Sequence, residues 1–457
     1  MKIRMQPLAF CGLFLCVMTF LFLGNTSLFA QIEQQETGGI RIDARGVVAR
    51  NAVQDFGRLA AEQLNAARAS YTLSNDVSAK SPMRCVSLNR MEESIIKSGG
   101  IITEEMKYLA GIQRITHVFY FPDSKDIVIA GPAEGWFPGY EGAMIGLESL
   151  QPVCELQHLI TALRAFGPNT EGPDLVTCSI DPTEEGSARL QQFLSRSFGL
   201  NTSRFVEGVR RSLGMQVIKV DGIPNTTHAA QMMVAADYRM KRIALGLDNL
   251  RVPGLQTFIA NTVPNVSNAL FRWYFVPDYD SVILTEDRTA LQLLGDGVRL
   301  VGENELVSET GERSAMGGEL DPGSQAFTES FTEHYPQIAR QALVFAQLRN
   351  WIDMLICAAH IQQENFYGQA GWSMEFFGNE EQYPLETFTA AREVAPVVAT
   401  RSIGRLTVAP VGGGITIQAE LALSDEHAQL DSDGKVAEQQ NQIALNLPED
   451  VWWWDVQ

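Results

Sequence analysis

The chain has 457 residues, of which 54 are Asp or Glu and 35 are Lys or Arg, so its formal charge is −19. A negatively charged surface repels nucleic-acid phosphates and anionic lipid, so we expect no nucleic-acid partner. A local basic patch could still attract an anionic group. The hydrophobic fraction of 45% is that of an ordinary globular protein and excludes a disordered chain.

The first thirty residues have the organisation of a secretory signal peptide. Lys2 and Arg4 precede an uncharged, mostly apolar run over 8–23, and the small residue Ala30 follows a polar stretch. This order predicts a signal over 1–30 and an exported protein, periplasmic or associated with the cell envelope. The alternative is that the segment is kept as a membrane anchor. A membrane-spanning helix needs roughly twenty apolar residues, and the run over 8–23 is shorter than that. We expect no transmembrane helix after signal cleavage.

Composition and turn residues divide the rest of the chain into regions. Residues 306–324 are rich in Gly, Glu and Ser, which indicates a linker. The expected regions are a lead-in over 31–45, a first α/β unit over 46–200, a second, related unit over 201–305, this linker, a C-terminal helical and β-hairpin region over 325–450, and a Trp-rich tail over 451–457.

Helical periodicity over 52–67 opens the first unit, and Ser87 and Thr103 each precede a helix-favouring run, as N-caps do. Two β-rich runs, 117–121 and 126–130, flank a Pro-Asp turn and predict a hairpin.

A similar order recurs later in the chain. Asn225-Thr226-Thr227 caps a long helix that starts near His228, and a second Pro-Asp turn at 277–278 separates an aromatic strand from a Val/Ile strand. We interpret this as a diverged internal duplication of a helix and β-hairpin unit. The alternative is that any two hairpins of this type look alike.

Between the two units, 175–180 and 215–220 read as strands. A helix over 181–194 begins with Asp181-Pro182, which suits an N-cap followed by the first helical position. Strands that alternate with helices and also form hairpins predict the α+β class, with mixed sheets and packed helices.

The C-terminal region begins with helical periodicity over 325–363, with an expected kink near Asn350. Apolar residues alternate with mostly polar ones over 415–423, which predicts a strand with one solvent-exposed face. Gly412-Gly413-Gly414 is expected to turn a hairpin with 405–408. The Trp452-Trp453-Trp454 tail would dock on its own domain or contact a partner.

No motif for a nucleophile, a metal or a cofactor appears, so the candidate site residues are weak. Asp126 and Glu134 could act as an acid–base pair. Glu134 and Trp136 follow a strand in a Gly/Pro loop and could line a binding site, although a packed turn is favoured. Asp237 and Lys241 stand four apart on a helix, where a surface ion pair is expected and a binding role is the alternative.

The histidines and cysteines point to no metal site. Cys357 and His360 could share one helix face, but zinc needs three or four ligands. Of the four cysteines outside the signal, Cys178 and Cys357 lie in apolar segments. If any disulfide forms, we expect Cys85–Cys154.

Four segments of the chain resemble an exported family of planctomycete-type bacteria known only as a domain of unknown function. They are 107–111 (KYLAG), 126–136 (DIVIAGPAEGW), 179–186 (SIDPTEEG) and 236–241 (ADYRMK). The resemblance covers about residues 50 to 425. It implies export and a shared fold, and it supplies no activity, cofactor or catalytic residue.

Two functions are compatible with these observations. The first is a non-enzymatic binding or assembly protein of the cell envelope, whose partner is an unknown protein or envelope polymer, in an oligomeric state that the sequence does not define. The second is a hydrolase that acts on envelope polymers through Asp126 and Glu134. The absence of a reaction motif favours the first.

Overall fold

A computed structural model of the chain describes residues 36–37, 39–51, 65–71, 73–139, 141–197, 200–262, 269–307, 313–315, 321–403, 405–408 and 411–456. The predicted signal peptide, most of the helical run over 52–67 and most of the linker over 306–324 lie outside these residues. From Gln35 onward the chain forms one compact unit.

Two large sheets organise this unit, and the predicted α+β class is confirmed. The ten-stranded sheet has the order β1 (Glu36–Thr37), β2 (Ile40–Ile42), β3 (Val47–Arg50), β16 (Glu393–Val394), β10 (Gln216–Asp221), β9 (Val176–Asp181), β19 (Val411–Ile417), β11 (Ala269–Asp278), β14 (Gly297–Val307) and β15 (Arg313–Ala315). The seven-stranded sheet has the order β20 (Ala428–Leu430), β12 (Ser281–Leu284), β13 (Ala290–Leu294), β5 (His117–Phe121), β6 (Asp126–Ala133), β4 (Ser81–Ser87) and β21 (Trp453–Asp455). Short pairs form between β7 (Trp136–Pro138) and β8 (Met144–Gly146), and between β17 (Thr400–Ile403) and β18 (Arg405–Val408).

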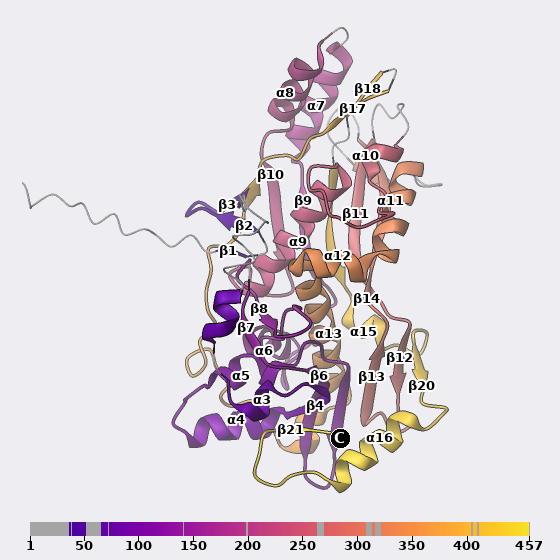
Figure 1. Ribbon diagram of the computed structural model, residues 1–457. Helices are drawn as coiled ribbons and strands as arrows, with labels where there is room; N and C mark the ends of the chain where they lie inside the picture. Colours follow the sequence, from indigo (N-terminus) through magenta and orange to yellow (C-terminus); the bar gives the residue numbers. More distant parts are fainter. Residues whose placement is uncertain are drawn as a thin grey trace, which may run out of the picture. The chain divides into compact units, whose positions relative to one another are not determined.

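Helices pack on and between the sheets (Figure 1). Those used below are α4 (Leu88–Lys97), α6 (Leu156–Ala165), α7 (Glu184–Arg196), α8 (Thr202–Leu213), α9 (His228–Ala244), α11 (Pro322–Glu333), α12 (Tyr335–Gln341), α13 (Leu343–Gln363), α15 (Ala419–Ala422) and α16 (Lys435–Leu445). Helix α9 packs on β9 and β19, whereas α13 contacts α6, α9 and one strand of each large sheet, β13 and β14.

The first predicted hairpin is confirmed, because β5 pairs with β6 in antiparallel register from His117–Ala130 to Phe121–Asp126. The second is wrong. Strand β11 pairs with β14 and β19, whereas β12 pairs with β13 and β20 in the other sheet. The second Pro-Asp sequence therefore ends one sheet and leads into the next, and the internal duplication is not established.

Helix starts follow the sequence closely. The side chains of Ser87, Thr103 and Thr227 each accept a hydrogen bond from the backbone N–H three residues on, as predicted for N-caps. The predicted cap at Asp181 is wrong: Thr183 caps α7, and its hydroxyl accepts from Gly186 N at 2.9 Å. Asp181 instead ends β9 and binds Arg272.

The long C-terminal helix is three helices, α11, α12 and α13. The backbone leaves helical geometry at Ala342 (φ −134°, ψ 91°), where α12 and α13 diverge by 118°. The expected kink at Asn350 is absent, because that residue lies inside α13. Within the described residues no single helix is long and apolar enough to cross a membrane, and only the bent pair α12 and α13 passes on length and composition.

Gly412, Gly413 and Gly414 lie within β19 and do not form the expected turn. A Cβ on Gly414 would lie 1.8 Å from the carbonyl oxygen of Cys178, and one on Gly413 would lie 2.0 Å from that of Trp273. Only glycine lets β9 and β11 approach β19 this closely. The alternating pattern continues past this strand as helix α15, so the outer half of the predicted strand is wrong.

The C-terminal tail packs on the rest of the chain. Strand β21 pairs with β4 through Trp453–Val86, Trp454–Cys85 and Asp455–Arg84. The fully buried Arg84 binds Asp455 at 2.8 Å, and its guanidinium lies 4.6 Å from the ring centre of Trp453.

Candidate functional site

The two acids of the hydrolase hypothesis occupy separate structural positions. Asp126 is buried at the start of β6 and accepts from Ser87 Oγ at 2.8 Å and from Arg90 Nε at 2.6 Å. Glu134 follows the end of the same strand. Eight residues of strand span about 26 Å, whereas paired glycosidase carboxylates lie within about 10 Å of each other. The structure therefore does not place Asp126 and Glu134 close enough together to act on the same substrate bond.

Glu134 organises a loop. One of its carboxylate oxygens accepts from Gln113 Nε2 at 2.7 Å, from Ser149 N at 2.9 Å and from Ser149 Oγ at 2.6 Å. Trp136 is fully buried, with its ring centre 5.8 Å from that of Tyr108. Glu134 therefore has the hydrogen bonds, and Trp136 the packing, of a structural turn.

The cysteines of the expected disulfide lie in different hydrophobic clusters, and the structure holds both as free thiols. Burial raises the pKa of the Cys85 thiol to about 12 and raises that of Cys154 further. Thiols of this kind are poor nucleophiles, since the thiolate is the reactive form.

Asp237 and Lys241 are not on the surface, so the predicted surface pair is wrong. Their side chains are 0% and 1% exposed, and Lys241 Nζ donates to Asp237 Oδ2 at 2.8 Å. The ammonium also donates to the carbonyl oxygens of Ile180 and Gly413, at 2.8 and 3.3 Å. Burial raises the pKa of Asp237 to about 7 against the opposing effect of Lys241. This pair joins α9 to β9 and β19 and is enclosed away from solvent.

A groove of about 560 Å³ opens beside α9 and has the character of a binding site. Helix α8 contributes Glu207, Arg210 and Arg211, helix α9 contributes Tyr238 and Arg242, and residues 395–398 form an apolar wall. Arg210 and Arg211 are exposed, whereas the Arg242 side chain is 16% exposed. Arg189 lies at the same end, because its guanidinium is beside Gly214, a lining residue.

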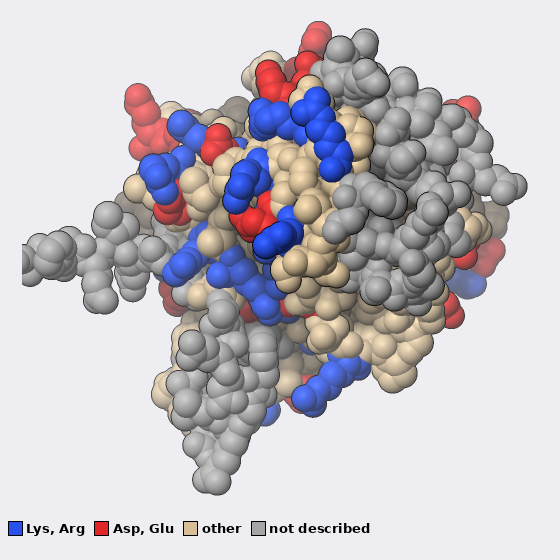
Figure 2. Space-filling model, turned by 90° about the horizontal axis from the view of Figure 1, so that it is seen from above, with Lys and Arg blue, Asp and Glu red and all other residues tan. Residues whose placement is uncertain are grey.

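The basic charge of this groove is only partly neutralised. Arg211 is 3.6 Å from Glu207 in an exposed pair, which contributes little binding energy. Arg242 is 3.9 Å from Asp248, a carboxylate that Arg50 and Arg239 also approach. Arg210 makes no ion pair with any residue that the structure describes. Helices α7 and α8 stand at the top of Figure 1, and Figure 2 shows Lys and Arg side chains gathered on the face seen from there.

An apolar hollow of about 610 Å³ continues this groove, since Leu247 and Val398 line both. Its other walls include Val206, Leu245 and Ala260. A ligand that spans both would meet arginines at one end and aliphatic side chains at the other.

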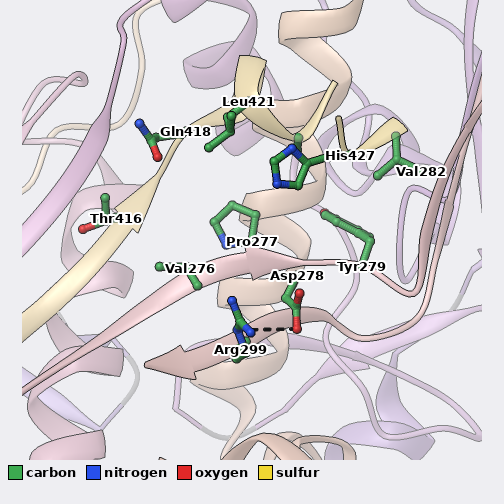
Figure 3. A pocket seen from close by; sticks show the side chains of 11 residues that line it. Val276, Pro277, Asp278, Tyr279, Val282, Arg299, Thr416, Gln418, Leu421 and His427 are labelled. Atoms are coloured by element: carbon green, nitrogen blue, oxygen red, sulfur yellow. Dashed lines mark ion pairs between the residues drawn. The ribbon is translucent and has the colours of Figure 1, made fainter. Parts of the chain in front are cut away.

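A third cavity, of about 240 Å³, lies where β11 ends (Figure 3). Asp278 and Arg299 face each other across its floor at 3.6 Å, and His427 points in from the opposite side. Because its two charged side chains pair with each other, this cavity is a weaker candidate than the arginine-lined groove.

One further cluster joins three residues that the sequence analysis does not associate. Glu155, His158 and His228 bring one carboxylate oxygen and two ring nitrogens within 4.8 Å of one another. The sequence analysis expects no metal site, and this set has the composition of one.

Residues 178–258 match the model of a family described as "Protein of unknown function (DUF1598)". Comparisons with curated proteins and with solved structures give no match. The matched segment supports the expected resemblance to a domain of unknown function. It runs from β9 to the start of the helix over 258–261 and includes the arginines of the groove, the Asp237–Lys241 pair and His228.

Neither the groove nor the three-residue cluster is predicted from the sequence. For the groove a signal exists: residues 178–258 contain ten Lys and Arg against seven Asp and Glu, in a chain whose overall charge is −19. For the cluster there is little signal, because His158 and His228 are seventy residues apart and meet only through helix packing.

Proposed function

We propose that the chain is a non-enzymatic binding protein of the cell envelope, and that the arginine-lined groove binds an acidic segment of a partner protein. The single observation that carries this proposal is a concave, basic surface on a strongly acidic chain. Acidic side chains of a partner would approach Arg210 and Arg211, and its apolar side chains would enter the hollow lined by Val206 and Leu245.

The wall formed by residues 395–398 favours a peptide over a compact anion. Residues 395–398 belong to no helix or strand. We expect this irregular main chain to pair with the main chain of an extended bound segment, which is how many peptides are recognised.

Export rests on the leader, since Lys2, Arg4 and the apolar run over 8–23 have the order that secretion requires. The four buried thiols are compatible with an oxidising compartment, because their raised pKa values and their burial protect them from oxidation. A non-enzymatic role is favoured because Asp126 and Glu134 are far apart and occupied by structural hydrogen bonds.

The test is fluorescence anisotropy with a short labelled peptide that alternates glutamate with leucine, added to the purified protein. We expect saturable binding that weakens as salt is raised, because exposed charges are screened. The same peptide with lysine in place of glutamate should not bind.

Matched variants locate the site. Arg210→Ala/Arg211→Ala should raise the Kd about tenfold, which corresponds to about 1.4 kcal/mol. Lys97→Ala/Lys435→Ala removes the same charge from exposed positions on α4 and α16 and should leave the Kd unchanged. Equal binding of the two peptides, or equal loss in both double variants, would refute the groove as the binding site.

A further inference from the structure

A cluster of three potential metal ligands lies where α6 and α9 begin. Glu155 is the residue before α6, His158 lies in its first turn, and His228 is the first residue of α9. His158 Nε2 is 2.8 Å from His228 Nδ1, and the same Nδ1 is 3.6 Å from Glu155 Oε2. Three ligand atoms from two helices thus point at one volume.

The cluster is enclosed and held in place. Glu155 and His158 are 8% and 5% exposed, and the His228 side chain is 11% exposed. The two imidazole rings are nearly parallel with their centres 4.9 Å apart, and the Phe388 ring stacks on His228 with its centre 5.2 Å away. Gln157 Nε2 donates to Glu155 Oε2 at 2.6 Å, the kind of outer hydrogen bond that orients a metal-binding carboxylate.

The charge of this cluster calls for a cation. Within the described residues Glu155 forms no ion pair with a Lys or Arg, and the titratable groups beside its carboxylate are the imidazoles of His158 and His228. Buried carboxylates in proteins are paired with a cationic side chain or coordinate a metal ion.

We propose that Glu155, His158 and His228 bind one Zn²⁺ ion. Two imidazoles and one glutamate are a known three-ligand set for zinc, and the fourth position is left to water or another small ligand. This assignment is independent of the arginine-lined groove, which uses other residues.

The geometry requires one small change on binding. Two nitrogens that each lie about 2.0 Å from a tetrahedral zinc ion are about 3.3 Å apart, so His158 and His228 must separate by about 0.5 Å. The ion replaces their hydrogen bond, and the ring that donates it must move its hydrogen to its other nitrogen. Once bound, zinc ties the start of α6 to the start of α9.

The experiment is titration of chelator-treated, full-length protein with ZnCl₂, followed by isothermal calorimetry and by thermal unfolding. We expect one ion per chain and a higher Tm in its presence, because a ligand that binds only the folded state stabilises it. CoCl₂ gives an independent readout, since cobalt in a three-ligand site of this kind should show the visible absorption of a tetrahedral complex.

Three variants decide the outcome. His228→Ala and Glu155→Gln should each lower zinc affinity at least about a hundredfold and abolish the cobalt spectrum; glutamine keeps the shape of Glu155, so its variant guards against misfolding, which far-UV circular dichroism checks. His427→Ala removes an exposed histidine outside the cluster and should bind as the parent does. No stoichiometric binding in the parent, or undiminished binding in a folded Glu155→Gln protein, would overturn the assignment.

Discussion

Lys241 and Asp237 show how one buried ion pair is accommodated in this chain. The ammonium has three acceptors, Asp237 Oδ2 and the carbonyl oxygens of Ile180 and Gly413, which replace the water it gives up. The second oxygen of Asp237 has no hydrogen-bond partner among the described residues. The pair is therefore well compensated on the lysine side and less well on the aspartate side.

This asymmetry leads to a prediction about substitutions. Asp237→Leu or Lys241→Met alone should cost about 3–5 kcal/mol of unfolding free energy, because each leaves one buried charge without its partner. The double variant should cost less than either single one, since it leaves no charge behind. Urea unfolding at pH 7 measures all three. A double variant whose loss equals the sum of the two single losses would show that the residues act independently, and that a stranded charge does not explain the single losses.

The pH dependence of the same proteins gives a second readout. The folded-state pKa of Asp237 is about 7 and its ordinary value is 3.8, so the folded protein binds the extra proton between these two values. The stability that this proton confers is fully present below about pH 4 and is lost as pH rises through 7. The free energy of unfolding of the parent should therefore fall relative to the Asp237→Leu/Lys241→Met protein between pH 5 and 8. A constant difference over this range would show that Asp237 stays ionised.

For single residues, the sequence predicts which side chains interact better than it predicts whether those side chains are buried. The spacing of Asp237 and Lys241 correctly predicts that they pair, because side chains four apart on a helix are neighbours. It cannot tell which face of α9 is covered, because Asp237 and Lys241 become buried only when strands distant in sequence pack against that face. Glu155, His158 and His228 show the same limit, since no local pattern relates α6 to α9.

Among the elements, β19 is where local reasoning fails most clearly. Three successive glycines are typical of a turn, but here they form a strand between β9 and β11. Glycine is required here because carbonyl oxygens of the neighbouring strands β9 and β11 occupy the space that a side chain on β19 would need. By contrast, the helix caps at Ser87, Thr103 and Thr227 and the β5–β6 hairpin were predictable, because their signals lie within a few residues of one another.

Substitution of these glycines tests this reading of the strand. Gly414→Ala should destabilise the protein by about 2–4 kcal/mol, because its Cβ would overlap the backbone of Cys178 and the strands must separate. Gly167→Ala is the matched control: its Cβ would have no neighbour closer than 3.5 Å, so the change should stay within about 1 kcal/mol. Chemical unfolding of both variants measures the difference. Equal effects of the two substitutions would mean that β19 can shift to accommodate a side chain at little cost. The presence of three glycines in this strand would then need another explanation.

For the molecule as a whole, α13 connects parts that the sequence assigns to separate units. Its Asp353 is fully buried and accepts from Arg114 Nε at 2.7 Å and from Tyr279 Oη at 2.7 Å. Arg114 precedes β5 in the seven-stranded sheet, and Tyr279 lies where the chain leaves β11 for β12. One carboxylate thus links a central helix to the crossover between the two sheets.

This linkage predicts how the protein unfolds. Chains of this length usually unfold in stages, but the shared helix should couple the two sheets into one calorimetric transition. Asp353→Asn leaves Arg114, whose side chain is 13% exposed, without its counter-charge and should lower the Tm of that whole transition, at a cost of about 3–5 kcal/mol. Asp425→Asn, at a fully exposed carboxylate, should leave the Tm unchanged. The opposite result would be two resolved transitions in scanning calorimetry, of which Asp353→Asn shifts only one. The two sheets would then unfold independently, and α13 would unfold together with only one sheet.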